Sequence, residues 1–177
     1  MVTSGVARRY ARAVFEIGRD DHDLDGWLRN LRVIRDVFED PTLRAFLENP
    51  AIPTEQKIHL VQATLGQLPE KARNFAILLV QNRRTALIEG IVVGYEEELN
   101  KLRGIVHAQV TTAVPLNDQT TSELEKRLSQ LTGARQVIMQ TTVNPSILGG
   151  FVARVGDRLI DASVVGRLDA LRESLMA

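Results

Sequence analysis

Apolar and polar residues alternate along the first 104 residues with the period of amphipathic helices. Large apolar side chains recur every three or four residues from Trp27 to Phe38, which places them on one face of a helix. Proline and glycine interrupt the pattern at short intervals and mark the ends of segments. The pattern predicts six helical segments, the third a single short turn: 5–18, from 23 or 25 to 39, 43–47, 53–66, from 69 onward, and 85–104.

The pattern changes after Gly104, where β-branched residues appear in alternating stretches typical of strands. This part predicts four strands, at 105–114, 136–143, 151–155 and 158–160, and two helices, at 117–133 and from 163 onward. A turn at Gly156-Asp157 would join the last two strands. We therefore predict a mostly α fold: an N-terminal six-helix bundle at 1–104, followed by a small α+β C-terminal domain at 105–177. About 70 residues is marginal for an independent core, so the second domain is expected to need a partner.

Composition and charge exclude several classes of protein. The chain has 44% hydrophobic residues and no cysteine, which rules out disulfides and zinc–thiolate sites. Acidic and basic residues balance, 15 of each up to Gly104 and 7 of each after it, so no nucleic-acid partner is expected. No apolar run approaches the roughly 20 residues of a membrane span, so direct membrane insertion is not expected. Arg8, Arg9 and Arg12 suggest a transit peptide, but acidic residues follow at once, and the polar face of a first helix explains them better.

Residues that could carry chemistry are sparse. His22, His59 and His107 are far apart and lack the spacing of metal ligands. No phosphate-binding loop is present, and the glycines at 149, 150 and 156 fit tight turns better than a dinucleotide fingerprint. No nucleophile elbow occurs either. The sequence therefore predicts no catalytic, cofactor-binding or metal-binding residues, and indicates a protein that connects other subunits.

Two helices are more apolar than a single core requires. On a helical wheel the apolar residues of the first helix span an arc of roughly 200°, whereas a helix on one core needs about 100°. In the fifth helix the run Phe75–Val80 surrounds the helix axis. Both helices could lie centrally in the bundle. Alternatively, they could border an exposed apolar groove that receives an amphipathic helix from a partner.

The sequence also resembles a known family along essentially its whole length. The similar segments are Tyr10–Phe15, Phe46–Ile52, Asn74–Arg84 and Val143–Phe151, followed by Gly156, Asp161 and Ser163. In this order and spacing they resemble the delta subunit of the bacterial F-type ATP synthase, the oligomycin-sensitivity-conferring protein family. Leu148 and Arg84 depart slightly from the residues expected there.

The resemblance implies a non-catalytic stator subunit without a cofactor. Such a subunit links the alpha subunits of the catalytic head to the b-type peripheral stalk, and resists rotation during proton-driven ATP synthesis. It would lie on the cytoplasmic face of the bacterial cell membrane as a peripheral component, and would not be an obligate homo-oligomer. Two other classes stay open: a helical adaptor of an unrelated assembly, and a small helical enzyme.

The resemblance also implies two binding regions. The first and fifth helices would receive the N-terminal helix of an alpha subunit, through these residues: Ala7, Tyr10, Ala11, Val14, Ile17, Phe75, Leu78, Leu79 and Asn82. The C-terminal domain would meet the b-type stalk helices. On that side Gly149, Gly150 and Asp161 would either contact the stalk or form a structural turn.

Overall fold

The computed structural model describes residues 4–156 and 158–176. The chain divides into two compact units, of which unit 1 ends at Leu99 and unit 2 begins at Asn100. Most described residues are helical, and a small four-stranded mixed sheet lies in unit 2. The predicted fold class, mostly α with a small α+β part, is confirmed at this level. The predicted turn at Gly156-Asp157 falls partly outside the described residues.

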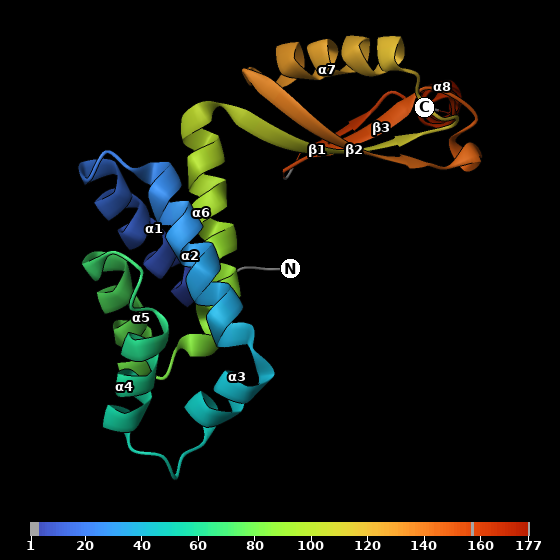
Figure 1. The fold of residues 1–177 in the computed structure, drawn as a ribbon. Helices are drawn as coiled ribbons and strands as arrows, with labels where there is room; N and C mark the ends of the chain where they lie inside the picture. The colour runs from blue at the N-terminus through green and yellow to red at the C-terminus, as the bar shows by residue number, and fades with distance from the viewer. Residues whose placement is uncertain (1–3, 157, 177) are drawn as a thin grey trace. The chain divides into compact units, whose positions relative to one another are not determined.

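Unit 1 is built from helices joined by short connections (Figure 1). They are α1 (Gly5–Asp20), α2 (Leu24–Glu39), α3 (Pro41–Glu48), α4 (Thr54–Thr64), α5 (Glu70–Gln81) and α6 (Ile88–Arg103), with a 3-10 turn, η1 (Thr85–Leu87), before α6. Side-chain oxygens cap the first three helices: Ser4 accepts from Ala7 N, and Asp23 from Gly26 N. Asp40 accepts from the backbone N–H groups of residues 42 and 43, so α3 begins earlier than the short predicted turn.

The core of unit 1 gathers apolar residues from all six of these helices. Leu31 and Ile34 of α2 are fully buried, as is Tyr95 of α6. The hydroxyl of Tyr95 donates to the carbonyl of Leu24 at 2.9 Å, and its ring meets that of Phe15 edge-on at 5.6 Å. This hydrogen bond satisfies a polar group that would otherwise be costly to bury.

Unit 2 contains a βαβ element extended by a hairpin. Its elements are β1 (Ile105–Thr112), α7 (Asp118–Thr132), β2 (Gln136–Val143), the 3-10 turn η2 (Pro145–Ile147), β3 (Phe151–Val155), β4 (Arg158–Asp161) and α8 (Val164–Met176). The strand order is β2-β1-β3-β4. β1 and β2 are parallel and are joined through α7, whereas β3 pairs antiparallel with both β1 and β4.

Only one face of this sheet is covered. Alternate residues of β1, Ala108 and Val110, are buried together with Leu124 and Leu128 of α7. The intervening residues face away from α7, and Ile138 and Leu159 on that side are 43% and 62% exposed. The core of unit 2 is accordingly small.

Unit 2 begins within α6, at Asn100. The side chain of Asn100 lies 3.1 Å from Nε2 of His107 in β1. The carbonyl of Gly104 accepts backbone hydrogen bonds from Arg135 and Gln136 at the start of β2. The last turn of α6 therefore packs with the sheet of unit 2 and belongs to that unit. The sequence placed the boundary after Gly104, where the pattern changes, because periodicity cannot show this contact.

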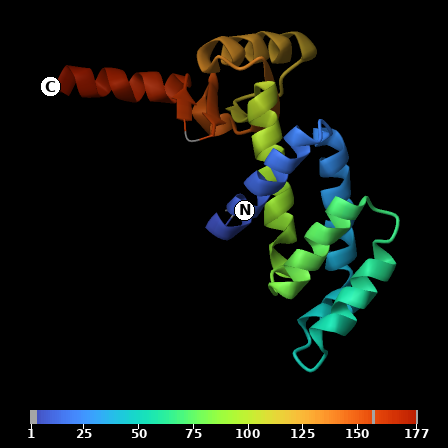
Figure 2. The ribbon, with the colours of Figure 1, turned by 90° about the vertical axis from the view of Figure 1, so that its left-hand side faces the viewer.

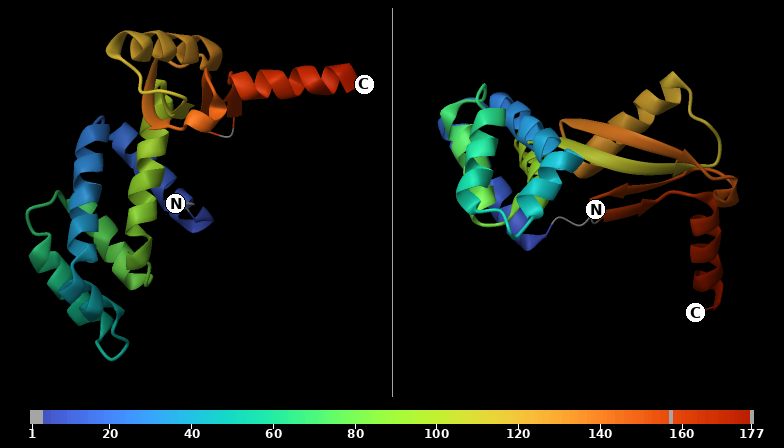
Figure 3. Two further views of the ribbon diagram at one scale, coloured as in Figure 1. Left: turned by 90° about the vertical axis from the view of Figure 1, so that its right-hand side faces the viewer. Right: turned by 60° about the horizontal axis from the view of Figure 1, so that its bottom comes forward.

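The last helix, α8, has no buried residue and extends from the sheet of unit 2 as a separate rod (Figures 2 and 3). Ser163 caps it, because its Oγ accepts from Gly166 N at 2.9 Å. Among the described helices, none combines the length and apolarity that a membrane span needs.

Candidate functional site

Helices α1 and α5 lie side by side within unit 1. The rings of Tyr10 and Phe75 meet edge-on with centroids 6.4 Å apart. At the other end of the contact, Lys71 in the first turn of α5 forms an ion pair with Asp21, which follows α1. The two helices that the sequence singled out as unusually apolar are therefore neighbours.

The predicted groove residues fall into two groups. Five of them are buried in the core of their own unit: Ala7, Ala11, Val14, Phe75 and Leu79. The remaining four leave surface available, since Ile17 is 41% and Leu78 is 43% exposed, Tyr10 is partly buried and Asn82 is exposed. The surface that a partner helix could reach is thus narrower than the predicted set.

Burial inside the unit accounts for about half of the wide apolar arc of α1. Ala7, Ala11, Val14 and Phe15 face the core, while Gly18 allows Trp27 and Tyr95 to approach closely. A Cβ at Gly18 would lie 2.7 Å from the Tyr95 hydroxyl. The sequence could not separate the core-facing part of the arc from the exposed part, because both are apolar.

A small polar network joins α1, α2 and α5 at one end. The indole Nε1 of Trp27 donates to one carboxylate oxygen of Asp21, and Lys71 binds the other. Hydrogen bonds from Lys71 and Trp27 lower the pKa of the Asp21 carboxyl below its usual value. Trp27 itself is 5% exposed, so its indole reports on a buried position beside α1.

In unit 2, Gly149, Gly150 and Asp161 form a junction that holds the start of α8. Val164 N donates to the carbonyl of Gly149 at 3.0 Å. A carboxylate oxygen of Asp161 accepts from Ser163 N at 2.8 Å, and hydrogen bonds from the Ser163 side chain and backbone lower the pKa of Asp161. These contacts give all three residues a structural role inside unit 2.

Two glycines make this junction possible. Gly150 has φ +74°, a conformation that L side chains rarely adopt, and a Cβ there would lie 2.2 Å from the carbonyl oxygen of Ala162. A Cβ at Gly166, in the first turn of α8, would lie 2.7 Å from the Asp161 carboxylate. The segment that crosses from η2 to β3 therefore packs directly against the one that enters α8.

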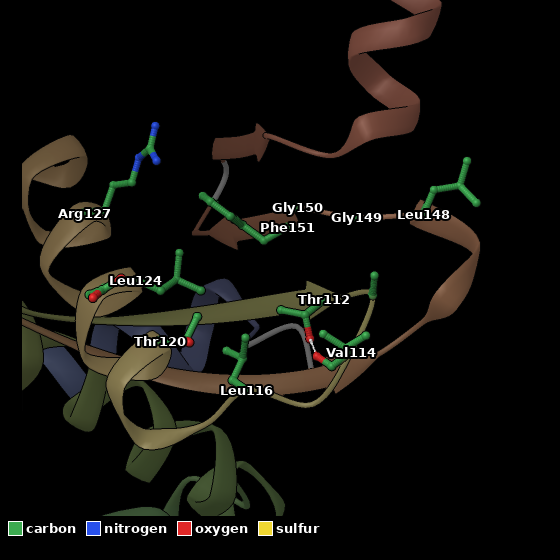
Figure 4. A pocket seen from close by; sticks show the side chains of 12 residues that line it. Thr112, Val114, Leu116, Thr120, Leu124, Arg127, Leu148, Gly149, Gly150 and Phe151 are labelled. Atoms are coloured by element: carbon green, nitrogen blue, oxygen red, sulfur yellow. Dashed lines mark hydrogen bonds between the residues drawn. The ribbon is translucent and has the colours of Figure 1, made fainter.

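An apolar cavity of about 500 Å³ lies next to the junction, between α7 and the ends of β1 and β3. Leu116, Leu124 and Phe151 line it, with Glu123 and Arg127 as its charged residues. Leu148 also belongs to the lining, and Figure 4 shows the hydrogen bond that the Thr112 hydroxyl donates to the Val114 carbonyl. Its lining includes neither histidine nor cysteine, and no cluster of three metal-binding side chains occurs among the described residues.

The apolar residues of α8 form an exposed surface that the sequence did not predict. Its leucines served only to predict a helix. The spacing of Val164, Leu168, Leu171 and Leu175 was visible in the sequence, but the same spacing also suits a helix buried in a core. The exposed fraction of these side chains distinguishes a helix on the surface from a helix buried in a core, and Leu175 is 79% exposed.

Comparison with known proteins agrees with this architecture. Residues 6–175 match the sequence model of the family described as ATP synthase delta (OSCP) subunit. The chain therefore belongs to this family. Members are non-catalytic, structural subunits of ATP synthase, and the chain is one of them.

Several relatives named ATP synthase subunit delta are similar over almost the full chain. The protein from Heliobacterium modesticaldum is 37% identical, covering 99% of this chain and 96% of the relative. The one from Gemmatimonas aurantiaca is 40% identical, with coverage of 96% and 92%. A chain in the cryo-EM structure of the Toxoplasma gondii mitochondrial ATP synthase hexamer has the same fold, with a TM-score of 0.64, 20% identity and coverage of 98% and 99%.

Proposed function

We propose that this chain joins the catalytic head of a bacterial F-type ATP synthase to its peripheral stalk. Unit 1 binds the N-terminal helix of an alpha subunit, and unit 2 binds the b-type stalk helices. In this position the subunit resists rotation of the head during proton-driven ATP synthesis. It lies at the cytoplasmic face of the cell membrane as a peripheral component of the complex.

The exposed apolar residues on α1 and α5 carry the first half of this proposal. A single exposed leucine is ordinary on a protein surface. Here Ile17 and Leu78 are both more than 40% exposed on neighbouring helices, and the half-buried ring of Tyr10 lies against α5. An amphipathic helix laid along these two helices would remove this apolar surface from water, which favours binding.

The test is a calorimetric titration of the full chain with a peptide from the alpha-subunit N-terminus of the same organism. Binding of about −8 to −12 kcal/mol is expected, which is micromolar to nanomolar. Ile17→Asp and Leu78→Asp should each weaken it at least about tenfold, because each puts a charge in the apolar contact. Leu102→Asp is the matched control, since Leu102 is 58% exposed on α6. Unchanged binding in folded Ile17 and Leu78 variants would place the groove elsewhere.

A second experiment tests membership of the complex directly. Affinity purification of the tagged chain from detergent-solubilised membranes of its own organism should recover alpha and b-type subunits together. Recovery of an unrelated set of proteins would support the adaptor alternative instead.

A further inference from the structure

Helix α8 presents a long exposed apolar surface, and its first turn is held to the rest of unit 2. Its contacts are with η2 and the residues around it, where Val164 N donates to Gly149 O. From there the helix runs outward for 13 residues with none buried. A helix of this length is marginal in water by itself, so a surface that covers α8 would stabilise it substantially.

The exposed apolar residues of α8 follow a heptad repeat. Val164, Leu168, Leu171 and Leu175 are separated by intervals of four, three and four residues, and are 42%, 55%, 56% and 79% exposed. Alternating intervals of four and three give the 3.5-residue period of a coiled-coil seam, with residues 164 and 171 at d positions and 168 and 175 at a positions. The surface that fits such a seam is another α-helix with the same period.

Two of the four positions that flank the seam carry arginine, and the other two carry Val165 and Ser174. Arg167 comes directly before the a-position leucine and so occupies a g position, and Arg172 comes directly after a d-position leucine and occupies an e position. The acidic residues of α8, Asp169 and Glu173, fall at the b and f positions on the outer side. Since e and g residues face the partner's flanking charges, α8 presents apolar residues bordered by positive charge.

We propose that α8 docks as one strand of a coiled coil with a partner helix whose own apolar heptad seam is flanked by carboxylates. This rests on the proposed stalk contact of unit 2 and specifies the element and the chemistry of the partner.

A second copy of α8 does not meet these requirements. In a parallel pair, Arg167 of one copy would face Arg172 of the other, because a g residue meets the e residue five positions further along. In an antiparallel pair with all four seam residues overlapped, Arg167 would face Ser174 and Arg172 would face Val165, so neither arginine would meet a carboxylate. Neither arrangement gives the arginines an opposite charge, and the parallel one brings like charges together, which is destabilising.

The junction at the start of α8 prepares the helix for docking. Asp161 and Ser163 hold the first turn through their hydrogen bonds, and Gly150 permits close packing against Ala162. A helix that already has a fixed direction loses less conformational freedom on binding than a flexible tail does. The partner helix therefore meets a preformed strand of the coiled coil.

The test uses the full chain and two synthetic peptides of three heptads, identical at their leucine and isoleucine a and d positions. One carries glutamate at every e and g position and the other carries lysine. The glutamate peptide should bind at least about tenfold more tightly than the lysine peptide, and added salt should reduce the difference. The double variant Arg167→Glu, Arg172→Glu should reverse the preference, while Leu168→Asp, Leu171→Asp should abolish binding of both.

Circular dichroism establishes that each variant keeps its fold, since all four positions are exposed. Equal binding of the two peptides, or a preference that survives the arginine reversal, would overturn the proposal, as would dimerisation of the wild-type chain through α8 in sedimentation equilibrium. The peptide titration does not involve the ATP synthase. Its failure alongside recovery of alpha and b-type subunits would reject only the coiled coil, whereas failure to recover those subunits would reject the proposed function.

Discussion

The indole nitrogen of Trp27 donates a hydrogen bond to the carboxylate of Asp21 across 3.2 Å. Asp21 also pairs with Lys71, so a single carboxylate links α2 and α5 just beyond the end of α1. Because α1 and α5 are the helices proposed to receive the alpha-subunit peptide, the environment of Trp27 depends on how these two helices are arranged.

Peptide binding is therefore expected to change the fluorescence of Trp27, the only tryptophan in the chain. A peptide that shifts α5 against α1 alters the hydrogen bond between the indole and Asp21, which moves the emission maximum. The measurement is a fluorescence titration run beside calorimetry. Asp21→Asn serves as the comparison, since it weakens the link and should reduce the shift. A flat emission with a clear calorimetric signal would place the peptide away from Trp27.

The same carboxylate predicts a pH dependence of stability. The pKa of Asp21 is lower in the folded chain than in the unfolded chain, so its contribution is fully present above the unfolded value of about 4. The contribution is lost as the pH falls through the lower, folded value. The melting temperatures of wild type and Asp21→Asn should thus differ near pH 7 and converge well below pH 4. Asp20→Asn is the control, because no hydrogen bond or ion pair of Asp20 is found among the described residues; a similar convergence there would contradict the assignment.

Val14 of α1 faces the core, whereas Ile17 faces solvent. Aspartate is therefore expected to lower stability at position 14 and to weaken peptide binding at position 17. Val14 is 1% exposed and Ile17 is 41% exposed. Val14→Asp should destabilise unit 1 by several kcal/mol, because it buries an unpaired charge. Ile17→Asp should change stability by less than about 1 kcal/mol and act on peptide binding instead. Chemical denaturation measures the free energy of unfolding of both variants. Equal losses of stability would mean that Ile17 is part of the core.

The junction below α8 can be probed with two glycines of almost the same backbone conformation. Gly150 and Gly133 have φ +74° and +73°, but a Cβ at Gly150 meets the Ala162 carbonyl at 2.2 Å, whereas nothing lies within 4 Å of a Cβ at Gly133. Gly133→Ala should therefore cost about 1 kcal/mol for the backbone conformation alone. Gly150→Ala should cost clearly more, since the junction has to shift, and Gly150→Val more again. Similar unfolding free energies for the two alanine variants would show that the close approach of residue 150 to the Ala162 carbonyl adds nothing to the cost.

The sequence predicted where helices and strands lie far better than it predicted which of their side chains are buried. The β2 strand has the bounds predicted for it, Gln136–Val143, because a stretch rich in β-branched residues favours a strand. Periodicity cannot tell which core a side chain meets. The apolar arc of α1 therefore contained both buried residues such as Ala11 and exposed ones such as Ile17. For α8 the problem was the reverse, since Leu168 and Leu171 look like core residues until their exposure is known.

The predicted second domain, 105–177, is expected to have little stability in isolation. Its core holds few buried residues, and the two leucines of α7 supply the largest of them. A domain of about 70 residues buries too little apolar surface for comfortable stability. We therefore expect the fragment 105–177 to be poorly ordered alone and to gain order when a glutamate-flanked heptad peptide covers α8, since a ligand that binds only the folded form stabilises it.

Fragments that begin at residue 100 and at residue 105 are expected to differ in thermal stability. A fragment that begins at Asn100 retains the contact of Asn100 with His107 and the whole of Gly104, whose carbonyl accepts from Arg135 and Gln136. It should melt at a higher temperature than 105–177, whereas 1–99 and 1–104 should differ little and both bind the alpha-subunit peptide. Circular dichroism measures the melting temperatures of the four fragments, with and without their peptides. If 105–177 melts cooperatively by itself at the same temperature as 100–177, the residues after Gly104 need neither the last turn of α6 nor a partner to fold.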